Sequence, residues 1–475
     1  MESISAIPAR KGRNGWSGTP ALAALSLCML MSSLGTSIAN VALPTLAEAF
    51  DASFQQVQWV VLAYLLSVTV AVVGVGRLGD VVGRKRLLAR GILLFTGAAL
   101  LSGLAPTLSL LVAARALQGL AAAIMLALAM ALAGEAVPAE RRGRAMGVLG
   151  AMSAIGTALG PSLGGLLIGG SGWRSTFLVL VPIGGIAFAL SRVHLPETCT
   201  TTGKEGASFD TLGMILLGAA VGAFALSMTI GRAGFGPLNL ILLGTAAVGL
   251  LLFFSWQTHA RAPLVQLSIL LRPGVAAALW MSFLVSTVLM ATLVVGPFYL
   301  TQALALAAPA AGAVLSVGPV VAALTGVPAG RAADRLGPGV VTVLGLAGIA
   351  AGCVLLGLLP VEFGLFGYIP AIAVLTFGYA LFQTANNVAV MAAAGADQRG
   401  VVSGLLNLSR NLGLVTGVSA MGAVFAGGAG TAAIAEASPD AVAAATRLTF
   451  MVAALLMLPA FALAAGRMKR WAQPL

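Results

Sequence analysis

Residues Gly74–Arg86 read GVGRLGDVVGRKR, and their first six letters match the G-x-G-x-x-G pattern of dinucleotide-binding enzymes. That pattern binds a nucleotide only where a β-strand precedes it and a helix follows it in a soluble α/β unit. Here long apolar segments lie on both sides, at about 56–76 and 87–105. The stretch therefore predicts a short basic connection between two membrane helices, and the dinucleotide interpretation fails.

The composition of the chain supports a membrane environment. Of 475 residues, 59% are hydrophobic and only 8% are charged, and the mean hydropathy is +1.02. A soluble domain carries roughly a quarter charged residues, so this sequence cannot cover a water-facing surface. Cys28, Cys199 and Cys353 lie far apart, which gives neither a metal-binding spacing nor a disulfide framework.

The apolar segments predict an all-α membrane protein with fourteen spans, since a helix needs about 20 apolar residues to cross a bilayer. We expect an N-terminal six-helix bundle, a linker with two additional helices and a C-terminal six-helix bundle. The boundaries are 1–19 for an N-terminal tail, 20–192, 193–273 and 274–475. The spans lie at about 20–43, 56–76, 87–105, 108–134, 144–168, 174–191, 211–230, 238–257, 274–299, 308–329, 339–359, 366–393, 401–425 and 445–466.

The net charge of +12 indicates how the chain is oriented in the membrane. All but five of the 26 Lys and Arg residues map to the termini and to connections on one side of the membrane; the exceptions are Arg174, Arg232, Arg447, Arg115 and Arg410. By the positive-inside rule both termini should be cytoplasmic, and we expect a multi-pass protein of the cell (inner) membrane. Nucleic-acid binding needs a contiguous basic face, which these scattered charges do not provide.

An internal repeat links the two halves. GRLGDVVGR (76–84) and GRAADRLGP (330–338) both fit G-R-x-x-D-x-x-G, 254 positions apart, and each follows the second helix of its bundle. Repeats at matching positions are typical of duplicated transporters. We expect a conformational switch in which a charge cluster holds the halves together in one state; a plain solvated turn is the alternative. Its residues are Gly76, Asp80, Gly83, Arg84, Gly330 and Asp334.

These residues resemble the cytoplasmic loop signature of the major facilitator superfamily, specifically its fourteen-helix drug:proton antiporter branch. LVAARALQGLAA (111–122) resembles the fourth-helix signature, GTALGPSLGG (156–165) the fifth-helix antiporter signature, and SIANVALPTLAEAF (37–50) the first-helix signature that contains Asn40. The resemblance implies alternating access, multidrug efflux, a small-molecule substrate, protons as coupling ion, a monomer in the lipid bilayer, and neither cofactor nor enzymatic activity. Asn40 is then expected in the substrate or proton pathway.

Arg115 lies about eight residues into the fourth span, with Gln118 one turn further on. A charge at membrane depth is costly and is by default a candidate functional residue. The resemblance implies a part in proton coupling. The alternative is an arginine satisfied by neighbouring carbonyl groups.

Gly156, Gly160 and Gly164 recur every four residues in the fifth span and form one smooth stripe, which Pro161 interrupts. We expect this stripe to act in the conformational switch as a rocking surface or seam between the halves. Static tight packing is the alternative.

In the second half, Tyr379, Gln383, Asn386 and Asn387 share one face of a span. Arg410 lies in the following span between Asn407 and Asn411. Amides facing lipid would be costly, so we expect these residues to line a cavity, with interhelical hydrogen bonding as the alternative.

One departure from the resembling branch affects the substrate. Gly35 stands where that branch commonly has an aspartate, and all 14 acidic residues map to termini, loops or helix ends. The chain thus lacks the usual proton carrier and the usual counter-charge for cationic drugs. We expect an anionic or neutral amphipathic substrate, because a carboxylate could pair with Arg115 or Arg410. Proton coupling would then use Asp80, Glu135 or the substrate itself.

Four alternatives to a gradient-driven exporter follow from the same sequence. No G-x-x-x-x-G-K-[ST] loop is present, so an ATP-driven pump is not indicated. A metabolite importer or a lipid-handling transporter on the same fold stays open. A membrane enzyme is disfavoured, because His194 and His259 are the only histidines and no metal-binding cluster appears.

Overall fold

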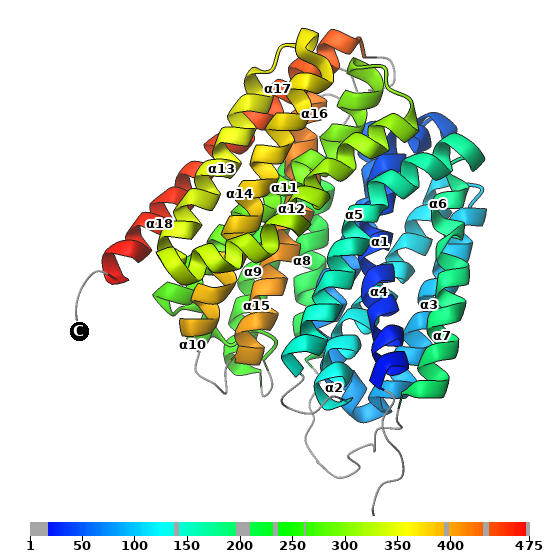
Figure 1. Cartoon of the computed structure of the whole chain (residues 1–475), viewed down its shortest axis with the longest axis vertical. Coiled ribbons are helices and arrows are strands. Elements are labelled where there is room, and N and C mark those ends of the chain that lie inside the picture. The colour runs from blue at the N-terminus through cyan, green and yellow to red at the C-terminus, as the bar shows by residue number, and fades with distance from the viewer. Residues whose placement is uncertain are drawn as a thin grey trace, which may run out of the picture.

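The computed structural model describes residues 18–136, 142–195, 210–230, 236–260, 263–393, 399–430 and 437–471. Within these ranges all regular structure is helical (Figure 1). Fourteen helical segments are long and apolar enough to cross a membrane. The predicted all-α architecture with fourteen spans is therefore confirmed, and the chain is a multi-pass membrane protein.

The first six spans form one bundle, coloured blue to green on the right of Figure 1. Its sixth span is broken at Val179 into two helices. The helices are α1 (Gly18–Ala49), α2 (Phe54–Val82), α3 (Arg84–Leu104), α4 (Leu108–Ala136), α5 (Arg142–Ser171), α6 (Arg174–Leu178) and α7 (Leu180–His194). Within the bundle, α1 packs against α5, and α2 and α3 pack against α4.

The last six spans form the second bundle, on the left of Figure 1. Two of its spans contain a turn of π-helix, η2 and η5, of the kind that often marks functional sites. The elements are α11 (Pro273–Phe298), η2 (Tyr299–Ala303), α12 (Ala308–Leu336), α13 (Pro338–Leu358), η3 (Val361–Phe363), α14 (Gly364–Ala393), α15 (Arg399–Thr416), η5 (Gly417–Met421), α16 (Gly422–Ala429), α17 (Pro439–Leu455) and α18 (Met457–Trp471). We call the side on which α1 begins and α18 ends the terminus side, and the other the opposite side.

The repeated motif has the same backbone in both bundles. Each copy ends on a glycine that breaks the helix, Gly83 between α2 and α3 and Gly337 between α12 and α13. Their φ angles are +94° and +83°, a region in which a residue with a side chain is strained. The duplication seen in the sequence therefore extends to the turn geometry.

Helices α8 (Thr211–Thr229) and α9 (Pro237–His259) form an antiparallel pair between the bundles in sequence, followed by the short α10 (Leu267–Leu270). Besides α9, helix α8 packs against α2 and also contacts α15 and η5 of the second bundle. The Trp59 indole N–H donates to the Thr229 hydroxyl at 3.2 Å. Leu240, Ile241 and Leu251 of α9 are exposed, as expected for a helix that faces lipid. The predicted domain boundaries themselves stay a prediction.

A clasp around Asp210 fixes this pair. The buried Asp210 carboxylate accepts hydrogen bonds from Gly213 N (2.8 Å), Trp256 Nε1 (2.7 Å) and Gln257 Nε2 (2.7 Å). Burial raises the pKa of the Asp210 carboxyl group, but these hydrogen bonds outweigh it and hold the pKa below its usual value. The clasp thus joins the start of α8 to the end of α9.

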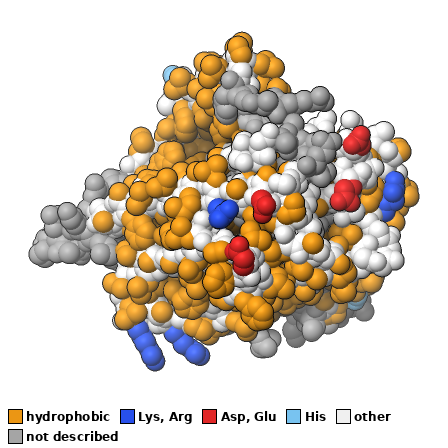
Figure 2. All heavy atoms as spheres, turned by 90° about the horizontal axis from the view of Figure 1, so that it is seen from above, with side chains coloured by type: hydrophobic (Ala, Val, Ile, Leu, Met, Phe, Trp, Pro, Cys, Tyr) orange, Lys and Arg blue, Asp and Glu red, His pale blue; other side chains and the backbone are white. Residues whose placement is uncertain are grey.

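The opposite side is mostly apolar where the structure describes it. Figure 2 looks onto that side and shows hydrophobic side chains with a few acidic and basic ones among them. The orientation expected from the Lys and Arg pattern stays a prediction.

Candidate functional site

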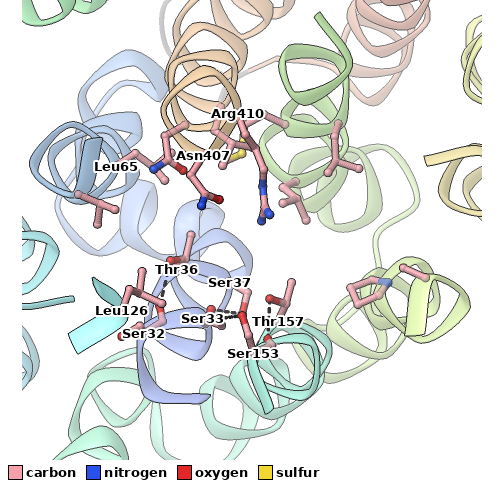
Figure 3. A pocket seen from close by; sticks show the side chains of 18 of the residues that line it. Ser32, Ser33, Thr36, Ser37, Leu65, Leu126, Ser153, Thr157, Asn407 and Arg410 are labelled. Carbon is pink, nitrogen blue, oxygen red and sulfur yellow. Dashed lines mark hydrogen bonds between the residues drawn. The ribbon is translucent and has the colours of Figure 1, made fainter. Parts of the chain in front are cut away.

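A cavity of about 550 Å³ lies between the two bundles. It is lined by α1, α2, α4 and α5 of the first bundle and by α11, α12, α14 and α15 of the second (Figure 3). Its apolar lining includes Met29, Leu65, Val68, Leu126, Met130, Leu289, Met290, Leu293, Leu315, Ile372 and Leu414. The cavity is therefore mostly apolar, with polar groups confined to a few walls, as is typical of small-molecule sites.

One polar wall is a row of hydroxyl groups on α1 and α5. Ser33 Oγ and Ser153 Oγ lie 2.6 Å apart and link the two helices. The Ser37 hydroxyl contacts Gly156 O at 3.2 Å and Ser33 O at 3.1 Å. Ser32, Thr36 and Thr157 continue this wall (Figure 3). The i, i+4 spacing of the α1 hydroxyls was visible in the sequence but was not used to predict the site.

The facing wall belongs to α15 and carries the cation of the cavity. Arg410 and Asn407 point from α15 toward the hydroxyl wall (Figure 3). Asn411 and Ser403 also line the cavity. Arg410 is exposed to this space, and the lining contains no Asp or Glu residue. Among the described residues the cavity thus has a positive charge and no counter-charge.

The four polar residues expected on one face of α14 do not stay together. Tyr379 lines the cavity and Gln383 does not. Asn386 is buried and its Nδ2 donates to Ala278 O of α11 at 3.1 Å, while Asn387 is exposed. Of this group the structure brings only Tyr379 into the cavity, and Asn386 makes the interhelical bond that was the alternative.

Arg115 and Gln118 lie behind the cavity wall. Arg115 is fully buried; its Nε donates to Val60 O at 3.0 Å and its Nη1 to Gln118 Oε1 at 2.6 Å. The guanidinium carbon lies 4.3 Å from the centre of the Tyr64 ring. Tyr64 lines the cavity and Arg115 does not. A part for Arg115 in proton coupling stays a prediction.

Gly35 lies beside the aromatic rings of Phe95 and Tyr64. A Cβ atom at this position would lie 3.0 Å from Phe95 Cζ and 3.7 Å from the Tyr64 hydroxyl. An acid here would therefore reach the Tyr64 hydroxyl, and the Tyr64 ring covers Arg115. In this chain the aromatic rings of Phe95 and Tyr64 occupy the surroundings instead.

The glycine stripe of α5 packs inside its own bundle. Side chains on these glycines would overlap α1; the neighbours are Leu30 for Gly156, Ser37 for Gly160, and Ile38 and Val41 for Gly164. We expected the stripe to lie between the halves, and these positions instead face a helix of the same bundle. A role in the conformational switch stays a prediction for them.

The contact between the bundles is made by neighbouring residues of α5. A methyl group on Gly165 would overlap Ala308 O, and one on Gly312 would overlap Pro161 O. Gly169 faces the Pro309 ring in the same way. Since α5 ends and α12 begins on the opposite side, the two bundles are in backbone contact there.

Aromatic side chains close the same side. The ring of Phe54 on α2 lies 4.9 Å from that of Phe298 and 5.2 Å from that of Phe425, both in the second bundle. Next to them, Gln58 Nε2 donates to Val418 O of η5 at 3.2 Å. These contacts pack α2 against α11, η5 and α16.

Helices α5 and α12 separate toward the terminus side. Along the α5 face that holds Pro161, Ala158 is half-buried, whereas Ala154 and Ala151 are exposed. Cβ atoms at Gly147 and Gly150 of α5, or at Gly326 and Gly330 of α12, would meet nothing within 4 Å. The cavity lining also reaches Ser403 and Gly404, close to where α15 begins. The cavity is therefore open on the terminus side.

The switch residues occupy the matching turns on the terminus side. Gly83 ends α2 and Arg84 begins α3, while Gly330 lies near the end of α12 and Asp334 is exposed. Gly76 and Asp80 lie in the last turns of α2, and their surroundings fall outside the described part. The conformational switch expected at these turns stays a prediction.

The amino-acid sequence of the chain is similar to those of known transport proteins. Residues 25–418 match the family model described as Major Facilitator Superfamily. The chain is 30% identical over 398 residues to the riboflavin transporter RibZ of Clostridioides difficile, covering 84% of this chain and 86% of RibZ. It is 30% identical over 416 residues to the multidrug resistance protein Stp of Mycobacterium tuberculosis, covering 85% and 75%.

The fold is also similar to a solved structure. A bacterial homologue of the human lysosomal transporter Spinster, in an inward-facing and unoccupied conformation, superposes with a TM-score of 0.68 at 15% identity. The match covers 96% of this chain and 98% of that chain. At this identity the likeness concerns the fold alone.

Proposed function

Because this chain belongs to the major facilitator superfamily, we propose that it is a secondary active transporter that exports small amphipathic compounds by alternating access. The observation that carries the proposal is the cavity of about 550 Å³ between the bundles. The cavity is open on the terminus side, while Phe54, Phe298 and Phe425 pack together on the opposite side. Rocking the bundles would reverse which side is open.

The direction of transport depends on orientation. The positively charged residues concentrate on the terminus side, so this side is proposed to be cytoplasmic in the inner membrane. The described state would then load substrate from the cytoplasm. We propose that the protein works as a monomer and that a proton gradient drives the cycle.

The charge of the cavity bears on the substrate. Arg410 faces a lining without carboxylates, which favours organic anions or neutral compounds over lipophilic cations. No described acidic residue in the cavity could carry a proton. Coupling is therefore assigned to a group elsewhere or to the acid of the substrate.

Everted membrane vesicles with an acidic lumen test this function. We expect carboxyfluorescein, an impermeant organic anion, to accumulate faster in vesicles that contain the protein, and a protonophore to abolish the difference. Ethidium, a permanent cation, serves as the comparison. Faster accumulation of ethidium than of carboxyfluorescein would contradict the proposed preference, and no accumulation of either would contradict export.

Uptake of a metabolite is a second candidate, favoured by the 30% identity to a protein named as a riboflavin transporter. The direction of transport separates uptake from export. Intact cells that express the protein should lose a preloaded substrate if it exports and should accumulate the added substrate if it imports.

A further inference from the structure

A buried amide oxygen in the cavity has no partner. Asn40 on α1 lines the cavity and is only 2% exposed. Its Nδ2 donates weakly to Thr36 O at 3.4 Å, whereas its Oδ1 has no hydrogen-bond partner among the described residues. Buried polar atoms are nearly always paired. An acceptor left unpaired in a ligand cavity therefore indicates a donor that arrives with the ligand.

Asn40 and Arg410 lie at different depths of the cavity. Asn40 is about 14 Å from the end of α1, which lies on the opposite side, by the rise of 1.5 Å per residue. Arg410 is about 16 Å from the start of α15, which lies on the terminus side. Asn40 thus lies at the closed end of the cavity, and Arg410 lies about midway along it, since the α15 lining runs from Ser403 near the opening to Leu414.

The groups between these two positions are less selective. The hydroxyls of Ser37 and Thr36 already donate to backbone carbonyl groups of their own helix. The remaining lining is largely apolar, with Met29, Leu293 and Leu315 among its side chains. An apolar body with few polar atoms suits this middle section. Asn40 Oδ1 is thus an unpaired acceptor at the closed end, and Arg410 is the charged group of the lining.

We infer that the preferred substrate is an elongated amphipathic organic acid with an N–H or O–H donor at the end remote from its acid. The donor binds Asn40 Oδ1, the acid pairs with the Arg410 guanidinium, and the apolar body lies between them. This inference rests on the proposed function and deepens it, because it assigns an orientation: donor first and acid toward the terminus side.

Three related ligands test the inference by equilibrium binding to the purified full-length protein. p-Hydroxyphenylhexanoate carries both groups, p-methoxyphenylhexanoate lacks the donor, and p-hydroxyphenylhexanamide lacks the acid. We expect the parent acid to bind about tenfold more tightly than either analogue, as one lost hydrogen bond or charge pair predicts. Asn40→Leu should abolish only the preference over the methyl ether, and Arg410→Gln only the preference over the amide.

Asn386→Leu is the matched control, because Asn386 is also a buried asparagine but lies outside the cavity lining and bonds α11. It should keep both preferences. Equal binding of phenol and methyl ether to the unmodified protein would overturn the inference and would mean that an ordered water satisfies Asn40. Failure of the parent acid to bind would overturn it as well. Neither result depends on transport, so failure of the exporter proposal in vesicles remains distinguishable.

Discussion

Replacing Arg410 by glutamine should weaken transport of organic anions selectively. Arg410 lines the cavity with no carboxylate in the lining, so its charge is available to the substrate. A hydrogen bond to a charged group contributes about 1.5–3 kcal/mol. Because Arg410 is exposed to the cavity, solvent screens the pair and the lower end applies. A loss of about 1.5 kcal/mol corresponds to roughly a tenfold rise in KM.

The assay is carboxyfluorescein accumulation in everted vesicles over a range of concentrations. Arg410→Lys keeps the charge and should retain most of the affinity. Arg192→Gln is the matched control, because Arg192 on α7 is exposed and lies outside the cavity lining, and its KM should not change. An unchanged KM in Arg410→Gln, or an equal rise in Arg192→Gln, would refute the assignment of Arg410 to the substrate.

Three further substitutions have defined outcomes. Gly35→Asp should raise ethidium transport and lower carboxyfluorescein transport, since the new acid would lie beside the Tyr64 hydroxyl. Gly35→Asn should change neither transport rate in this way, and equal effects of the two substitutions would mean that charge is not the cause. Gly312→Leu should reduce transport by roughly tenfold or more, because its side chain would meet Pro161 O and hold the bundles apart. Gly97→Leu is the control, because Gly97 on α3 is exposed, has open space around it and lies outside the cavity lining; it should keep at least about half the activity, and the reverse order would contradict the closure assigned to α5 and α12. Asp210→Asn should cost about 1–3 kcal/mol of stability at pH 7. Because the pKa of Asp210 is lowered in the fold, its contribution to stability is present above its usual pKa and is lost as the pH falls below about 4. The thermal unfolding temperatures of the two proteins should therefore converge at low pH, and a constant difference across pH would argue against an ionic clasp.

Much of the fold could be predicted from the sequence, because lipid imposes simple rules. Apolar length alone predicts fourteen spans, and the motif that ends at Gly83 and again at Gly337 predicts the duplication. Apolar length does not show the helix interruptions: the break at Val179 and the π-turn Gly417–Met421 occur inside continuous apolar runs, and only Pro182, three residues after the break, is a sequence signal for the first of them. Hydropathy carries no signal for them.

The cavity was harder to predict than the fold. Arg410 and Tyr379 carry a polar signal in an apolar segment and do line the cavity. The same signal marks Arg115 and Asn386, which instead bond neighbouring backbone. Polar residues at membrane depth must be satisfied, and a sequence does not tell whether a neighbouring helix or a ligand does so. Only the packing of α1, α5 and α15 around one space separates these cases.

A reversible cross-link between the bundles tests alternating access most directly. Gly169 and Pro309 face each other across α5 and α12 on the opposite side, and both can be changed to cysteine in a background in which Cys28, Cys199 and Cys353 are replaced by serine. We predict that oxidation of this pair stops carboxyfluorescein transport and that reduction restores it, while oxidation leaves the transport rate of each single cysteine variant unchanged. Undiminished transport by a fully cross-linked protein would contradict the account.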